Sequence, residues 1–92
     1  MIVSSEQARN VLGITTRDFA GMFVVLRRAG VSVEMKCARN SKNHFFTMNY
    51  FDVDHAIEAI TDRINNHPLR GRYKCYWKDR LEQLKQIKKG IV

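Results

Sequence analysis

The 92-residue sequence has few cysteines and no long apolar segment, and each scarcity excludes a class of protein. Its two cysteines, Cys37 and Cys75, lie far apart and outside any Cys-x-x-Cys pair, which argues against a zinc site and against a disulfide-rich secreted scaffold. We expect both to be reduced thiols that act as small hydrophobic side chains. No run approaches the roughly 18 apolar residues that a membrane-spanning helix requires.

Sequence signals for catalysis and export are also missing. The chain has no Gly-x-Ser-x-Gly motif, no phosphate-binding glycine loop, no zinc-protease helix and no paired-carboxylate motif. The three histidines, His44, His55 and His67, are scattered, so we expect neither a metal nor another cofactor. The first residues lack the basic and apolar regions of a signal peptide. We therefore expect a cytoplasmic, non-enzymatic protein with no membrane attachment.

The whole chain has a net charge of +7, and acidic residues are scarce in its C-terminal third. Residues 1–64 hold 8 Lys/Arg and 7 Asp/Glu, a net charge of +1, whereas residues 65–92 hold 8 and 2, a net charge of +6. A positive field attracts phosphate groups of nucleic acid or anionic lipid. Because the excess is confined to one end, it favours an anionic partner over a basic surface that serves only solubility.

The segment SSEQARNVLGITTRDF predicts two helices joined by a tight turn. Ser4 and Gln7 have the spacing of a capping box, which starts the first helix. Gly13 ends it, because glycine adopts a left-handed backbone without steric cost. Thr15 is a suitable N-cap for a second helix over residues 16–28. The apolar face of that second helix has spacings of three and four and consists of Phe19, Met22, Phe23 and Leu26.

A β-hairpin is predicted after the second helix. Residues 31–37 and 44–51 alternate between apolar and polar side chains, which is typical of strands. The polar, turn-rich segment between them suits a hairpin loop. We expect Arg39 and Lys42 at an exposed basic tip, flanked by Lys36. The apolar face of the first strand would carry Val31, Val33, Met35 and Cys37.

Two further helices complete the prediction. The third begins after a cap at Asp52 or Asp54 and is broken by the residues 65–68. The fourth spans about residues 73–89, and its lysines could neutralise DNA phosphates. One side of this fourth helix is apolar, and we expect it to form core or a partner or dimer interface. That side consists of Tyr73, Trp77, Leu81 and Leu84.

The motifs SSEQARNVLGITTRDF and FDVDHAIEAI resemble the small excisionase and MerR-type winged helix-turn-helix DNA-binding domains. The resemblance covers roughly residues 3–64. It implies an α+β, mainly helical fold in which residues 1–67 form the winged helix-turn-helix domain. Residues 68–92 would then be a basic helical extension packed on this domain or on a partner subunit.

The resemblance also implies where DNA would bind. In that family the second helix enters the major groove, and the wing reaches the neighbouring minor groove or the backbone. Arginine can donate two hydrogen bonds to guanine, threonine can make a short contact, and lysine suits phosphate. The corresponding positions in the helix and wing are Thr16, Arg17, Arg27, Arg28, Lys36, Arg39 and Lys42. The basic C-terminal segment adds Arg70, Arg72, Lys74 and Lys78.

The second helix departs from the family pattern, because it is apolar nearly all round. Val24 and Val25 fit base edges poorly, so one face is expected to pack on the C-terminal helix or a second subunit. The primary hypothesis is a transcriptional regulator or recombination directionality factor, of the kind found in phages, that binds double-stranded DNA. The alternative is a protein-binding module that grips a partner through its apolar second helix and the Trp77 helix. RNA binding is less favoured, because no aromatic-rich strand motif is present.

Overall fold

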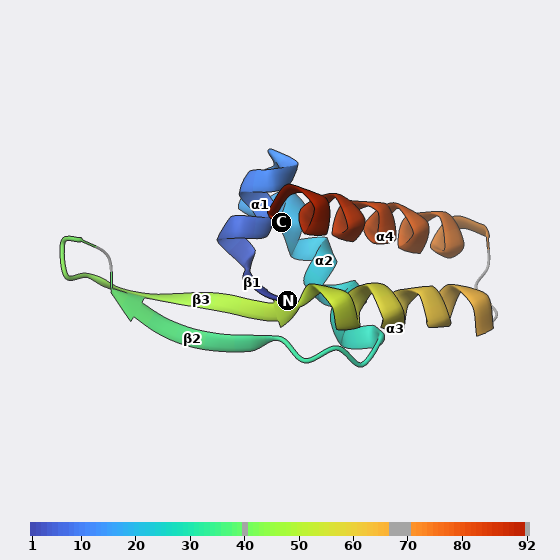
Figure 1. Ribbon diagram of the computed structural model, residues 1–92, viewed down its shortest axis with the longest axis horizontal. Coiled ribbons are helices and arrows are strands. Elements are labelled where there is room, and N and C mark those ends of the chain that lie inside the picture. Colours follow the sequence, from blue (N-terminus) through green and yellow to red (C-terminus); the bar gives the residue numbers. More distant parts are fainter. Residues whose placement is uncertain (40, 67–70, 92) are drawn as a thin grey trace.

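The computed structural model describes residues 1–39, 41–66 and 71–91, which form an α+β structure dominated by helices. The elements are β1 (Ile2–Ser4), α1 (Ser5–Leu12), α2 (Thr16–Arg28), β2 (Glu34–Arg39), β3 (Phe45–Asp52), α3 (Val53–Asn66) and α4 (Gly71–Ile91). The molecule measures 48 × 23 × 22 Å. Its length arises because the β2–β3 hairpin projects from one end of the helical body while α3 and α4 extend toward the other (Figure 1).

The sheet is antiparallel and has the strand order β1-β3-β2. The expected hairpin is confirmed, with strands that begin and end slightly later than predicted. Opposite pairs include Val3 with Phe51, Lys36 with Met48, and Arg39 with Phe45. β1 was not predicted from the sequence, because its three residues are too few to display an alternating pattern. β1 matters because it ties the residue before α1 to the inner end of the hairpin.

Local sequence signals explain the two N-terminal helices. Ser4 Oγ accepts a hydrogen bond from the Gln7 backbone N–H at 3.1 Å, and Gln7 Oε1 accepts one from the Ser4 N–H at 3.0 Å. This is the predicted capping box. Gly13 ends α1 with φ 66°, and Thr15 Oγ1 accepts from the Asp18 N–H at 3.2 Å at the start of α2. The predicted caps and the bounds of α2 are therefore confirmed.

A single hydrophobic core joins all four helices of the described residues to the inner part of the sheet. α4 packs against α3, α1 and α2. From α4, the side chains of Trp77, Leu84 and Ile87 enter the same core as Val3 and Phe51. α4 therefore shares its core with the first 66 residues. The domain boundary expected between residues 67 and 68 lies outside the described residues.

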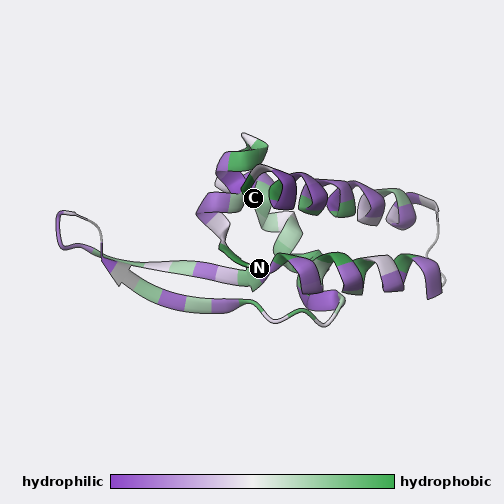
Figure 2. Ribbon diagram, in the orientation of Figure 1, coloured by the Kyte–Doolittle hydropathy of each residue, from purple (hydrophilic) through white to green (hydrophobic). Residues whose placement is uncertain are grey.

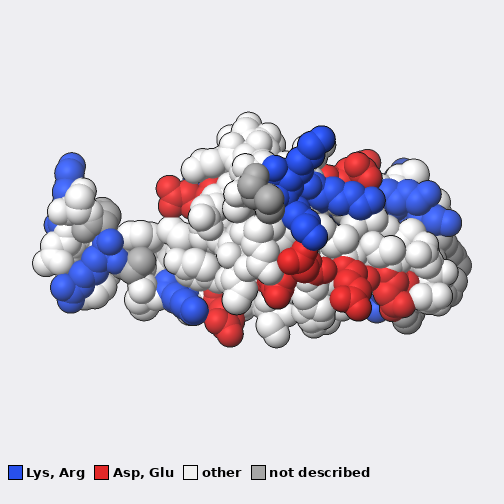
Figure 3. All heavy atoms as spheres, viewed as in Figure 1, with Lys and Arg blue, Asp and Glu red and all other residues white. Residues whose placement is uncertain are grey.

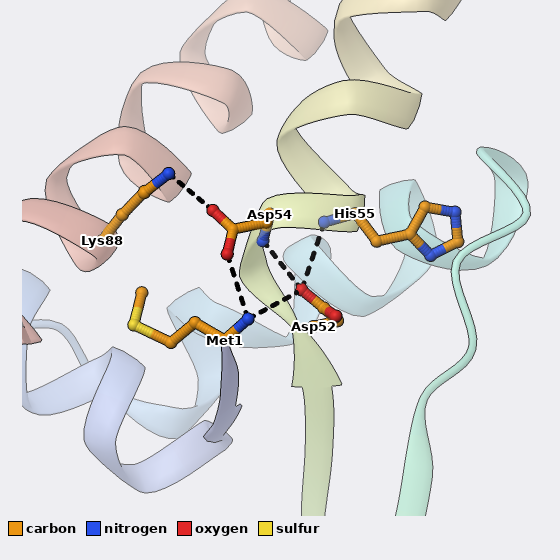
Figure 4. A network of polar contacts seen from close by, with 5 residues as sticks. All are labelled: Met1, Asp52, Asp54, His55 and Lys88. Carbon is orange, nitrogen blue, oxygen red and sulfur yellow. Dashed lines mark hydrogen bonds and ion pairs between the residues drawn. The ribbon is translucent and has the colours of Figure 1, made fainter.

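A network of polar contacts joins the start of α3 to the end of α4 and to the Met1 amine (Figure 4). Asp52 caps α3, because its Oδ1 accepts hydrogen bonds from the backbone N–H groups of Asp54 at 3.0 Å and His55 at 3.2 Å. The Asp54 carboxylate contacts Lys88 Nζ on α4 at 2.6 Å. The Met1 amine lies 3.3 Å from Asp52 and 3.0 Å from Asp54.

These contacts lower the pKa of both carboxyl groups. The pKa of Asp52 falls mainly because its carboxylate accepts the hydrogen bond from the His55 N–H. The pKa of Asp54 falls mainly because of its hydrogen bond with Lys88. The ionised form of each carboxylate therefore stabilises the folded state.

The expectation that both cysteines act as small hydrophobic side chains is wrong. Cys37 and Cys75 are free but exposed, so neither acts as a buried hydrophobic residue. Met35 is 68% exposed, although the alternating pattern placed it on an apolar face. The physical reason for Met35 and Cys37 is that β2 extends beyond the helical body. The alternation of polar and apolar residues continues along this part of the hairpin (Figure 2). Val31, which was expected in the same strand, instead precedes β2 and is buried because it lies before the projection.

Candidate nucleic-acid interface

A hollow of about 270 Å³ lies where α1, α2 and β3 meet. We call this hollow the corner. Its lining comes from the start of α1, one side of α2 and the middle of β3. The lining residues are Ser5, Glu6, Arg9, Thr16, Phe19, Phe23, Phe46, Thr47, Met48 and Asn49. The fold thus places the first residue of α2 beside the hairpin, with one basic side chain, Arg9, contributed by α1.

α2 presents one exposed sector between two packed sides. Successive residues are about 100° apart around a helix axis, which places Thr16, Ala20, Val24 and Arg27 within one sector. All four are exposed, and Arg17 borders them. The opposite sector is buried and consists of Phe19, Met22, Val25 and Leu26. The exposed sector therefore has polar or basic residues at both ends and small apolar residues in its middle.

α4 packs beside this exposed sector. The Tyr76 hydroxyl donates to the Gly21 carbonyl oxygen at 3.4 Å, and Arg80 Nη2 donates to Tyr76 Oη at 3.1 Å. A Cβ on Gly21 would lie 2.6 Å from Tyr76 Oη, so the glycine permits this close approach. The apolar second helix is accordingly covered by the core on one side and by α4 on another.

An apolar groove of about 220 Å³ follows the contact between α2 and α4. Its lining residues are Val24, Val25, Arg28, Arg72, Tyr73, Tyr76 and Trp77. Of the four residues expected at a partner or dimer interface, Tyr73 is 58% exposed, whereas Trp77 and Leu84 are buried in the core. Leu81 is half-buried. Tyr73 is thus the member of this set that a partner could reach.

The outer hairpin, which we define as residues 35–49, carries three Lys/Arg and no Asp or Glu. Lys36 and Arg39 lie on β2, Lys42 lies in the tip loop, and all three are exposed. Lys36 Nζ lies 3.7 Å from Glu34 and 5.4 Å from the Tyr50 ring centroid. Because this ion pair is solvent-exposed, it contributes little and leaves Lys36 able to contact an anion.

The lysines of α4 form a separate surface. The side of α4 that contacts α2 carries Tyr76 and Arg80, and Lys74 and Lys78 lie roughly 120–160° around the helix from these two residues. Lysines and arginines follow α4 beside the acidic side chains of α3 (Figure 3). Lys85 also contacts Glu82 at 3.6 Å. The structure therefore does not bring these lysines together with α2 and the hairpin.

The remaining sequence-predicted positions divide in the same way. Arg27 and Arg28 are exposed at the end of α2, and Arg72 lines the groove beside Arg28. Arg70 lies outside the described residues. The predicted basic residues thus do not form one surface. Those of the hairpin project from one end of the molecule, Arg28 and Arg72 line the groove between α2 and α4, and Lys74 and Lys78 lie on the far side of α4.

The contribution of α1 to the corner was not predicted from the sequence. Arg9 follows Ser5 by four residues and Glu6 by three, so it lies near both on the surface of a short helix. That spacing was available as a signal. The sequence could not show where this face of α1 lies, because only the pairing of β1 with β3 brings it beside the hairpin.

Comparison with protein families, with curated proteins and with solved structures finds no match to this chain. Within the described residues, no three His, Cys, Asp or Glu side chains are grouped closely enough to hold a metal ion. None of the helices in the described ranges combines the length and apolar character needed to cross a membrane. The geometry of the corner and of the hairpin therefore carries the functional argument.

Proposed function

We propose that this protein is a winged helix-turn-helix protein that binds double-stranded DNA without catalysing a reaction. In this proposal α1 and α2 form the helix-turn-helix, α2 is the recognition helix, and the β2–β3 hairpin is the wing. The biological role would be control of transcription or of recombination direction, in a phage or another mobile element. β1 supports the assignment because it fixes the hairpin to the residue that caps α1.

The observation that carries the proposal is the corner. It places the start of α2 next to a projecting hairpin whose outer part has basic residues and no carboxylate. A phosphate backbone that crosses the corner would meet Arg9, while the exposed start of α2 would face base edges. Arg17 is suited to a bidentate contact with guanine. Lys36, Arg39 and Lys42 would hold the backbone or the neighbouring groove.

A charge-swap series tests this placement. We expect Arg9→Gln to weaken binding to a fluorescent duplex and Glu6→Gln to strengthen it, because both side chains line the corner and carry opposite charges. Lys78→Gln is the matched control, since it removes one positive charge from the far side of α4. Anisotropy titrations at several salt concentrations measure all three. Each lost phosphate contact should reduce the salt slope by about 0.9.

Two results would contradict the proposal. One is the absence of duplex binding by the wild-type protein at about 50 mM salt, where attraction to phosphate is strong. The other is equal weakening by Arg9→Gln and Lys78→Gln, which would mean that net charge alone determines affinity. Arg17→Ala then separates the roles: it should reduce preference for one sequence, by roughly 1–3 kcal/mol if its contact is bidentate.

A second candidate function is recognition of a protein partner at the groove between α2 and α4. Val24, Tyr73 and Tyr76 are 46%, 58% and 39% exposed there, and Arg28 and Arg72 line the same groove. Neither arginine forms an ion pair within the described part of the chain. A segment with an apolar side chain flanked by carboxylates would match this groove. Tyr73→Ala should abolish such binding and leave duplex affinity unchanged, whereas loss of duplex affinity would place DNA at the groove.

A further inference from the structure

Phe45 is an aromatic side chain that lies outside the hydrophobic core. It is 70% exposed and begins β3 beside the hairpin tip. By strand alternation it points to the same face of the sheet as Phe51, which is 2% exposed and belongs to the core. That face thus continues past the end of the helical body, and Phe45 lies on the part that no helix of the described residues covers.

The ring of Phe45 is held next to a cation. Arg39 is its direct partner across the hairpin, and the Arg39 guanidinium lies 4.3 Å from the ring centroid. Arg39 Nη1 also donates to Asn43 Oδ1 at 3.1 Å, and Asn43 has a left-handed backbone with φ 62°. These contacts fix an exposed ring and an exposed positive charge side by side at the end of the molecule.

The residues around Phe45 and Arg39 favour a partner that is a polyanion and also has flat apolar surfaces. The outer hairpin has no carboxylate, so an anionic partner meets no repulsion along it. A phosphate contact explains Lys36, Arg39 and Lys42, but it gives no role to an exposed phenyl ring. The minor groove of DNA offers both chemistries, because it attracts arginine and exposes the edges of stacked bases.

We propose that Phe45 is a wedge that enters a base step from the minor groove and kinks the duplex, with Arg39 held in the groove beside it. The inference rests on the proposed function and adds DNA bending to it. Apolar wedges of this kind partly unstack a step and bend DNA by about 20–90° toward the major groove. Pyrimidine–purine steps should be preferred because they unstack most easily.

The test uses the full chain and a duplex of ~20 base pairs, about two helical turns. The duplex has one central TA step with 2-aminopurine beside it, and donor and acceptor dyes at its ends. Binding of the wild-type protein should raise 2-aminopurine fluorescence, which reports unstacking, and should increase energy transfer, which reports bending. Phe45→Ala should still bind with the same salt slope but lose both signals. Phe45→Leu, which keeps an apolar wedge, should restore part of each.

Ile2→Ala is the matched control, because Ile2 is a comparably exposed apolar residue, 69% exposed, on β1. It should behave as the wild type, and circular dichroism should show that all variants are folded. Wild-type binding without either signal, or retention of both signals by Phe45→Ala, would overturn the wedge and leave DNA binding intact. A wild-type protein that fails to bind any duplex at about 50 mM salt would overturn the proposed function together with the wedge.

Discussion

Two phenylalanines on one face of β3 behave in opposite ways. Phe51 is 2% exposed and lies 6.4 Å, between ring centroids, from Phe19 in the core. Phe45, six residues earlier on the same strand, is 70% exposed. The strand pattern is the same at both positions, and only the presence of the helical body differs. The comparison teaches that alternation specifies a strand but not its burial, and that the outer hairpin is available for a partner.

The largest expected effect separates these two residues directly. Phe51→Ala should destabilise the protein by about 3–5 kcal/mol, because it removes a buried ring and leaves a cavity. Phe45→Ala should change stability by no more than about 0.5 kcal/mol, as expected for an exposed site. Urea denaturation followed by circular dichroism measures both. A comparable loss in Phe45→Ala would show that the tip packs against something in the free protein and would end the comparison.

A second variant tests whether α4 is part of the helical body that buries Phe51. Leu84 is fully buried in the common core, so Leu84→Ala should cost about 2–5 kcal/mol in the free energy of unfolding. Its exposed neighbour Lys85 supplies the control, and Lys85→Ala should be close to neutral. If α4 were an independent extension, Leu84→Ala would instead leave the main unfolding transition of α1–α3 where it is in the wild type.

The junction between the two regions supplies a smaller effect. β3 ends at Asp52, whose side chain caps α3 and thereby orients the hairpin relative to the body. Asp52→Ala should cost about 0.5–2 kcal/mol, the usual range for a lost N-cap. Asp52→Asn, which can still cap, should recover most of that stability in the same denaturation assay. Equal losses in the two variants would show that the negative charge rather than the cap is what matters.

The smallest effect is expected in acid. The folded pKa of Asp54 lies below its ordinary value near 3.8, mainly because of Lys88, so its stabilising contribution is fully present above that value. As the pH falls through the folded pKa, the carboxylate is protonated and the contribution is lost. Asp54→Asn should therefore reduce the loss of stability below about pH 4, measured by thermal unfolding across the acidic range. An unchanged acid profile would mean that neither the contact with Lys88 nor the contact with the Met1 amine contributes.

The sequence alone predicted the features that depend on neighbouring residues. The Ser4–Gln7 capping box, the turn at Gly13 and the bounds of α2 follow from interactions within a few residues, and all are confirmed. The small α+β, mainly helical class was also predictable from these elements. The sequence left open which carboxylate caps α3, and the structure identifies Asp52.

Features that depend on distant pairing could not be predicted. β1 is recognisable only through its register, in which Ile2 lies opposite Asp52. The corner depends on the same pairing, so the position of Arg9 beside the hairpin could not be predicted. The exposure of Met35 was also hidden, because nothing in a strand pattern shows where the body ends. The separation of the basic residues into different surfaces likewise depends on how α4 packs against α2.

The most direct test of the central claim, that duplex DNA binds at the corner and along the outer hairpin, is a nuclear magnetic resonance titration. Isotope-labelled protein would be titrated at about 50 mM salt with a duplex of ~20 base pairs. We predict that the amide signals of Arg9, Thr16 and Thr47 shift progressively, while those of Glu58 and Asp62 on α3 stay in place. Shifts confined to the groove around Tyr73, or no shifts at all, would contradict the claim.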